Sequence, residues 1–164
     1  MRACAPLLLI ALLVWAGCAP PVDLTTGLQI KDVGTGWFDA GIVNGQNKLV
    51  PSITFTVKNL SDQKLVALQV NAVFRRVTEK DEWGAGFLMV TGSEGLAPGM
   101  EAGPLTIRSQ LGYTGSDQTR EDMLRNSHFV DAEVELFAKY ASQQWKRVGE
   151  YVISRRLITK QPSQ

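Results

Sequence analysis

The sequence predicts an all-β protein, an antiparallel immunoglobulin-like β-sandwich of about seven or eight strands with one short helix before the penultimate strand. Three observations lead to this prediction. Apolar and polar residues alternate through most of the chain, turn-forming residues separate the alternating segments, and only one segment carries helical signals. The segment from residue 27 to residue 158 is long enough for one domain with a hydrophobic core.

The clearest strand signals lie in residues 53–58, 66–75 and 130–140, where every second residue is apolar. Val70 and Val134 lie in the middle of two of these segments, so we expect them in the core. The other expected strands are weaker or longer: residues 28–33, 37–43, 86–91 and 105–111, and a final strand from about Trp145 to Ile158 with a bulge at Gly149.

One segment has the signals of a helix of about two turns. Thr119 with Asp122 resembles a capping box, Met123 and Leu124 supply an apolar side, and Asn126 can end the helix. We expect this helix to cross from one sheet to the other.

The N-terminus carries Arg2 and then a short apolar run that ends at Ala16-Gly17-Cys18. The run has the length of a secretory signal rather than of a spanning helix. Its ending resembles the lipobox of bacterial lipoproteins, which implies cleavage before Cys18 and acylation of the Cys18 thiol. Trp15 stands where lipoboxes usually carry leucine, so an ordinary signal peptide with a chance cysteine is the alternative.

This resemblance divides the chain into a signal peptide at 1–17, a lipidated cysteine with a proline-containing tether at 18–26, a β-sandwich domain at 27–158 and a polar tail at 159–164. Cys4 and Cys18 are the two cysteines of the sequence, so the mature chain cannot form an internal disulfide. Ala19 follows Cys18, and the absence of aspartate there implies sorting to the outer membrane.

The charge of the mature chain is balanced, because removal of Arg2 leaves basic and acidic residues equal at 16 each. This balance argues against nucleic acid as a partner and against polybasic attraction to anionic lipid.

A second resemblance concerns residues 50–112. The segment Phe55-Thr56-Val57-Lys58-Asn59-Leu60-Ser61, the long strand that follows it and Leu96-Ala97-Pro98-Gly99 are similar to immunoglobulin-like modules of the FxLYD type in bacterial envelope lipoproteins. The tyrosine-aspartate ending that names that family is absent here, because Arg75-Arg76 follow Phe74.

Residues for catalysis are sparse. His128 is the one histidine, no Gly-x-Ser-x-Gly motif accompanies a serine, and the mature chain has no thiolate pair for zinc, so we expect no enzyme, no cofactor and no metal. Asp131, Glu133 and Glu135 share one strand face. They could bind calcium or a cationic partner, or form a solvated face balanced by Lys146, Arg155 or Arg156.

Aromatic residues are the best candidates for a recognition surface. Trp37 and Phe38 are adjacent, so one of them should point outward if they lie on a strand. Trp83 and Phe87 lie in or beside a segment that contains Gly84 and Gly86. We expect this glycine pair, and the pair Gly34 and Gly36, to lie in loops at strand ends. Exposed aromatics on such loops are good anchors for a partner, although all four could instead close the ends of the sandwich.

We therefore expect a lipid-anchored protein of the bacterial envelope, on the periplasmic face of the outer membrane, whose β-sandwich binds or positions another envelope protein of unknown identity. The alternatives are a subunit that completes a larger envelope assembly, which predicts an exposed apolar patch, and an enzyme that works through carboxylates, which predicts two buried acids with shifted pKa values.

Overall fold

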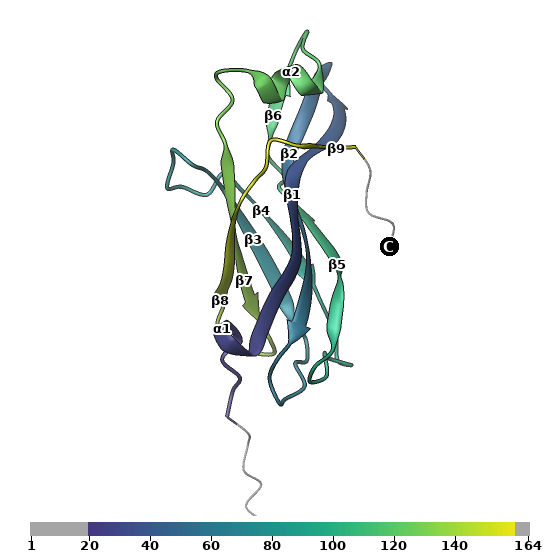
Figure 1. The fold of residues 1–164 in the computed structure, drawn as a ribbon, viewed down its shortest axis with the longest axis vertical. Coiled ribbons are helices and arrows are strands. Elements are labelled where there is room, and N and C mark those ends of the chain that lie inside the picture. The colour runs from purple at the N-terminus through teal and green to yellow at the C-terminus, as the bar shows by residue number, and fades with distance from the viewer. Residues whose placement is uncertain (1–19, 160–164) are drawn as a thin grey trace, which may run out of the picture.

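The computed structural model describes residues 20–159 and shows an all-β sandwich of two sheets (Figure 1). The first sheet has the order β5-β2-β1-β9, with β6 paired to β2, and the second has the order β4-β3-β7-β8. The chain changes sheet four times, after β2, β4, β6 and β8. The elements are α1 (Leu24–Gly27), β1 (Leu28–Val43), β2 (Gln46–Asn59), β3 (Gln69–Arg76), β4 (Gly84–Met89), β5 (Glu101–Arg108), β6 (Tyr113–Gly115), α2 (Arg120–Arg125), β7 (Ala132–Lys139), β8 (Lys146–Val152) and β9 (Leu157–Ile158).

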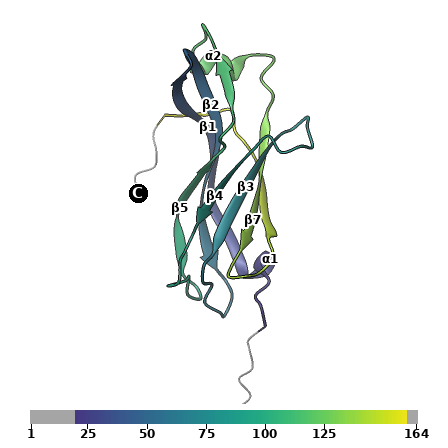
Figure 2. The ribbon, with the colours of Figure 1, turned by 180° about the vertical axis from the view of Figure 1, so that it is seen from behind.

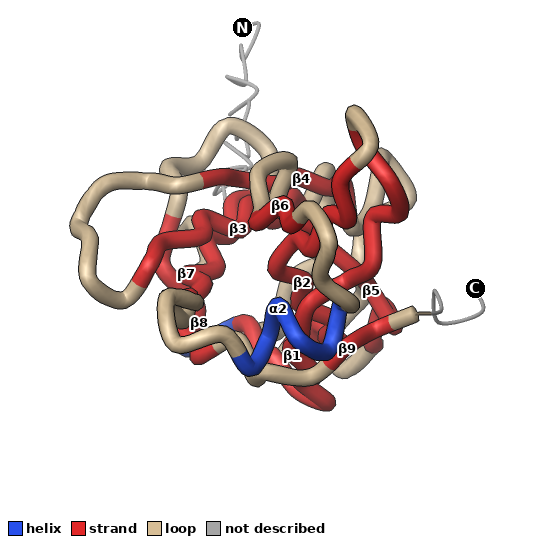
Figure 3. The backbone as a smooth tube through the Cα atoms, turned by 90° about the horizontal axis from the view of Figure 1, so that it is seen from above, coloured by secondary structure: helices blue, strands red, loops and turns tan. Residues whose placement is uncertain are grey.

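The sandwich is elongated and has two different ends (Figures 1 and 2). We call one end the base; it consists of residues 20–27, which include α1, and of the connections 60–68, 90–100 and 140–145. We call the other the distal end; it holds the β1–β2 turn, β6 and α2. Figure 3 looks along the long axis and shows α2 beside the ends of β1 and β9.

The core follows the predicted alternation. Val70 and Val134 are fully buried between the sheets, whereas Asn71 on the other face of β3 is half-buried. β3 begins at Gln69 rather than at Val66, because Val66 lies in a turn where Ala67 has a positive φ of 49°. The register of the central strands is therefore confirmed, and the start of β3 was placed too early.

The β1–β2 hairpin is the longest feature of the fold. Its two-residue turn is Asn44-Gly45, with φ values of 52° and 77°, which suit the tight type I′ turn. β1 continues through Gly34 and Gly36 as one strand with two register shifts, so the expected loop at these glycines was wrong. Gly36 is needed because a Cβ there would lie 2.8 Å from the carbonyl oxygen of Arg156.

The expected final strand is in fact two strands in different sheets. β8 pairs with β7, and its ladder ends where the Ile153 amide donates to the Ala132 carbonyl. The chain then crosses to the first sheet, where the Trp37 amide donates to the Arg156 carbonyl over 2.7 Å and β9 pairs with β1 in parallel. The bulge was predicted correctly, because the β7–β8 register shifts beside Gly149.

The helix α2 has the predicted cap, since the Asp122 amide donates to the Thr119 hydroxyl over 3.1 Å. Met123 and Leu124 are buried, as expected. Because the final strand is divided, α2 precedes the third strand from the end rather than the penultimate one. The one-turn helix α1 was not expected.

Two glycines of β4 allow the sheets to meet at one edge. A Cβ on Gly84 would collide with the Ser109 side chain, and one on Gly86 would collide with Ile107 and lie 2.7 Å from the Arg108 carbonyl. Gly84 and Gly86 are therefore strand residues facing β5, and not the loop residues that we expected.

At the base, Asn59 links two loops from a fully buried position. Its Nδ2 donates to the carbonyls of Gln63 and Leu96, each over 2.8 Å, and its Oδ1 accepts from the Ser61 amide and hydroxyl. The Gly99 amide donates to the Asn59 carbonyl over 2.8 Å. Asn59 thus joins the β2–β3 connection to the β4–β5 connection at the base.

Candidate functional site

The adjacent aromatics Trp37 and Phe38 lie on opposite faces of β1, as the strand period requires. Trp37 is fully buried in the core, so it cannot contact a partner. Phe38 lies on the outer face of the first sheet, where the Arg108 guanidinium stacks 3.6 Å from its ring centroid. Burial lowers the pKa of Arg108, although an arginine stays charged at any physiological pH.

Trp83 is half-buried and closes the distal end of the sandwich. Its ring lies 5.0 Å from that of Tyr113 and 6.2 Å from that of Trp37, and Phe129 packs edge-on against Trp37 at 4.6 Å. We call Trp37, Trp83, Tyr113 and Phe129 the aromatic cluster. The packing of Trp83 fits the alternative that it closes the end of the sandwich, while its remaining exposure leaves a contact with a partner as a prediction.

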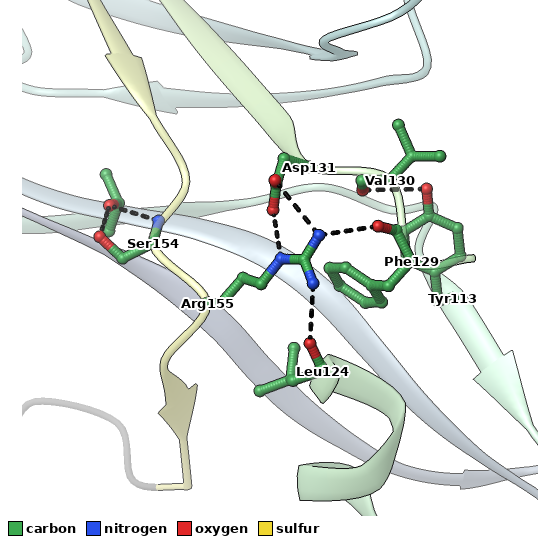
Figure 4. A network of polar contacts seen from close by, with 8 residues as sticks. Tyr113, Leu124, Phe129, Val130, Asp131, Ser154 and Arg155 are labelled. Carbon is green, nitrogen blue, oxygen red and sulfur yellow. Dashed lines mark hydrogen bonds and ion pairs between the residues drawn. The ribbon is translucent and has the colours of Figure 1, made fainter. Parts of the chain in front are cut away.

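Arg155 fixes the distal end, as Figure 4 shows. Its guanidinium pairs with both oxygens of Asp131, at 2.6 and 3.2 Å, and donates to the carbonyls of Leu124 and Phe129. The hydrogen bond to Asp131 raises the pKa of Arg155. Because these partners come from α2 and from the chain before β7, Arg155 holds both in place over the aromatic cluster.

Arginines pair with two of the three predicted acids, Asp131 just before β7 and Glu135 on it, whereas Glu133 has no ion pair among residues 20–159. Asp131 pairs with Arg155, as one alternative supposed, while Glu135 pairs with Arg75 and Arg147. Neither Lys146 nor Arg156 is a partner of these acids within residues 20–159. No group of three potential metal ligands lies together in that part of the chain. The contacts thus favour an ion-paired sheet face over a calcium site.

Three exposed carboxyl groups show perturbed pKa values, and all three are lowered. The Thr25 amide lowers the pKa of Asp23, backbone amides lower that of Glu94, and the Lys31 side chain lowers that of Glu101. A general acid needs the opposite shift, which burial produces. These groups therefore lack the features of a carboxylate-dependent active site.

His128 is exposed at the distal end, on the wall of a shallow pocket. Its amide donates to the Asn126 side chain over 2.9 Å, which is a turn contact. The pocket measures about 190 Å³ and has apolar walls from Tyr113, Met123 and Phe129. It is large enough to receive one side chain of a partner.

The tip of the β1–β2 hairpin lies beside this pocket. Ile42 is 69% exposed and Val43 is 39% exposed. The tip is fixed to the rest of the distal end by β6, which pairs with β2, and by the Asn47 side chain, which donates to the Gln118 carbonyl over 2.7 Å. Sequence reasoning missed these two residues, although the Asn44-Gly45 turn beside them was the signal that could have placed them at a tip.

Phe87 is the predicted site residue that is openly exposed, at 57%. It lies in β4 on the outer face of the second sheet and not in a loop. Its ring meets that of Trp145 edge-on at 6.5 Å, and Met89, two residues further along β4, is also more than half exposed. The structure thus separates the four candidate aromatics: two pack in the aromatic cluster, one lies under Arg108, and Phe87 joins an exposed patch near the base.

Cys18, the predicted lipidation site, lies outside the described residues. Between residues 20 and 159, no helix is sufficiently long and apolar to cross a membrane.

No protein-family model matches this chain, and no curated protein matches it by sequence. Among solved structures, the X-ray structure of Northeast Structural Genomics Consortium target SoR45 is similar at 13% identity and a TM-score of 0.45, over 80% of this chain and 89% of that one. A likeness of this size carries no argument about function.

Proposed function

We propose that this chain is a lipoprotein of the bacterial envelope, anchored through Cys18 to the periplasmic face of the outer membrane, and that its sandwich binds or positions another envelope protein without catalysis. The apolar run that ends at Ala16-Gly17-Cys18 supports the anchor. The lowered pKa values of the exposed acids and the ion pairs of Asp131 and Glu135 support a binding role over an enzymatic one.

The exposed tip of the β1–β2 hairpin is the observation that carries the binding role. Ile42 is 69% exposed at the end of a hairpin that β6 and the Asn47 side chain hold to the distal end, so its side chain adds little to the core and is free to contact a partner. With the shallow pocket beside it, which is lined by both apolar and polar side chains, the tip offers a projecting anchor and a recess, which are the features of a small protein-binding surface. The partner surface that we propose is therefore the distal end, at Ile42, Val43 and the pocket of Tyr113, Met123 and Phe129.

Acylation is tested by replacing Cys18 with serine. Metabolic labelling with a palmitate analogue should label the wild type and leave the variant unlabelled, with uncleaved precursor or soluble protein instead. Equal labelling of both proteins would exclude Cys18 as the acylation site.

Partner binding is tested by site-specific photo-crosslinking in the native host, followed by mass spectrometry. A photoreactive residue at Ile42 or Gln118 should give a discrete adduct with one envelope protein, and the same residue at the exposed Val152, on the outer face of β8, is the matched control. The double variant Ile42→Ser/Val43→Ser should lose the Gln118 adduct while its melting temperature is unchanged. Adducts from Val152 alone, or from no position at the distal end, would contradict the proposal.

A further inference from the structure

The folded domain begins closer to the N-terminus than the sequence indicated. We expected a tether over residues 18–26, but the Gln63 side chain donates to the Pro20 carbonyl over 2.8 Å, and the Val22 amide donates to the Tyr140 hydroxyl over 2.5 Å. Asp23 then caps α1, and Leu24 is buried in the core. From Pro20 onward, the chain is therefore part of the base.

This attachment limits the distance between the base and an anchor at Cys18. Pro20 is two positions after Cys18, and two extended residues span at most about 7 Å. An acylated Cys18 lies at the membrane interface, so the base must lie against the headgroup layer and cannot stand away from it.

The base carries the side chains that such a position needs. Leu60 and Met100 are each more than half exposed there, Met89 is more than half exposed at the adjoining end of β4, and Trp145 is 39% exposed in the β7–β8 turn. Tryptophan is enriched at membrane interfaces, where its ring suits the headgroup region. The Lys139 ammonium lies 4.9 Å from the Trp145 ring, which pairs an interfacial aromatic with a cation that can reach a lipid phosphate.

The base carries Asp23, Asp62 and Glu94 against Lys64, and the adjoining strand ends add Lys58, Lys139 and Lys146 against Glu101, so the four acids are balanced by four lysines. Lys31 and Lys58 both pair with Glu101, and Lys146 lies near Asp23. Apolar contact is thus the main attraction, and anionic lipid is not required.

We infer that the base is a membrane-docking surface, in which Trp145, Met89, Leu60 and Met100 enter the interface of a phospholipid bilayer. This inference rests on the proposed anchor at Cys18. Docking at the base orients the long axis of the sandwich away from the membrane and presents the distal end, with Ile42 and Val43, to a partner.

Tryptophan fluorescence tests the docking directly. The mature acylated protein is reconstituted into phosphatidylcholine liposomes that contain phospholipids brominated near the headgroup. After removal of residues 1–17 the chain has three tryptophans, of which Trp145 lies at the base and Trp37 and Trp83 at the distal end. Brominated lipid should quench part of the emission of the wild type, and the variant Trp145→Phe should lose the quenched part. Unquenched wild-type emission, or full quenching that remains in Trp145→Phe, would overturn the inference.

Single-cysteine variants give an independent readout, because Cys18 is the one cysteine of the mature chain and its thiol is acylated. An environment-sensitive label on Met100→Cys should shift to shorter wavelength in liposomes, while the same label on Val43→Cys at the distal end should not. If the Met100→Cys label is shielded from a water-soluble quencher but untouched by brominated lipid, a protein covers the base, and the docking inference fails.

The intact mass of the same samples separates the two proposals. A protein without an acyl group would refute the anchor itself. If the protein is acylated but the labels attached at the base remain exposed to water, docking is refuted and the anchor at Cys18 is not. Melting curves of each variant confirm that the exposed substitutions preserve the fold.

Discussion

Replacing the buried Asn59 with alanine should destabilise the domain by about 2–4 kcal/mol. The Asn59 side chain makes four hydrogen bonds: two donated to the carbonyls of Gln63 and Leu96, and two accepted from Ser61. Each of these hydrogen bonds contributes about 0.5–1.5 kcal/mol net to the free energy of unfolding. Because Ser61 and Gln63 are half-buried, water can bond to some of the groups that the substitution leaves unpaired.

Thermal unfolding followed by far-UV circular dichroism measures this effect. At about 3 °C per kcal/mol for a domain of this size, Asn59→Ala should melt about 6–12 °C below the wild type. Ser61→Ala loses the contacts of its hydroxyl with the Asn59 side chain and with the carbonyl and amide of Gln63, but it keeps both bonds donated by Asn59, so its melting temperature should fall by less. A melting temperature of Asn59→Ala within about 2 °C of the wild type would refute the reasoning.

Asn59→Asp adds a test that depends on pH. A carboxylate there would face the carbonyls of Gln63 and Leu96, so the pKa of the new carboxyl in the folded state should lie above its unfolded value. The folded variant then binds a proton more readily than the unfolded chain, and its deficit relative to the wild type should shrink as the pH falls. A deficit that grows in acid would contradict this account.

Three further substitutions test the packing. Val70→Asp buries an unpaired charge and should lower the free energy of unfolding by about 3–5 kcal/mol, whereas Asn71→Asp on the outer face should leave it nearly unchanged. If denaturant unfolding shows equal losses of stability for the two variants, the register of β3 is wrong. Trp83→Ala removes a ring from the aromatic cluster and should lower the free energy of unfolding by about 2–3 kcal/mol, with a lower melting temperature. An unchanged melting curve would show that Trp83 does not stabilise the distal end and would favour it as a binding residue. Gly86→Val should push β4 away from Ile107, which a lower melting temperature would report; wild-type stability would mean that the β4–β5 contact is loose.

Some features of the candidate sites followed from local sequence. The strand period at Trp37-Phe38 placed one ring inward and the other outward, and the structure agrees. The environment of Trp83 did not follow, because the polar residues before it suggest an exposed loop. Its burial depends on Tyr113 and Trp37, which are distant in sequence. Ile42 and Val43 could have been recognised from the Asn44-Gly45 turn that follows them.

The sequence by itself determined the fold class, the faces of the central strands and the start of α2. Each of these depends on residues within a few positions of one another: alternation decides which side chains of β3 and β7 face inward, and Thr119 caps α2 through a bond to Asp122. Only the tertiary structure decided that the last expected strand divides at residues 153–156, that Gly86 faces β5, and that Pro20 is bonded to the base. These features depend on contacts between segments far apart in the chain, and local patterns of hydrophobicity carry no information about which distant partner a backbone group will meet.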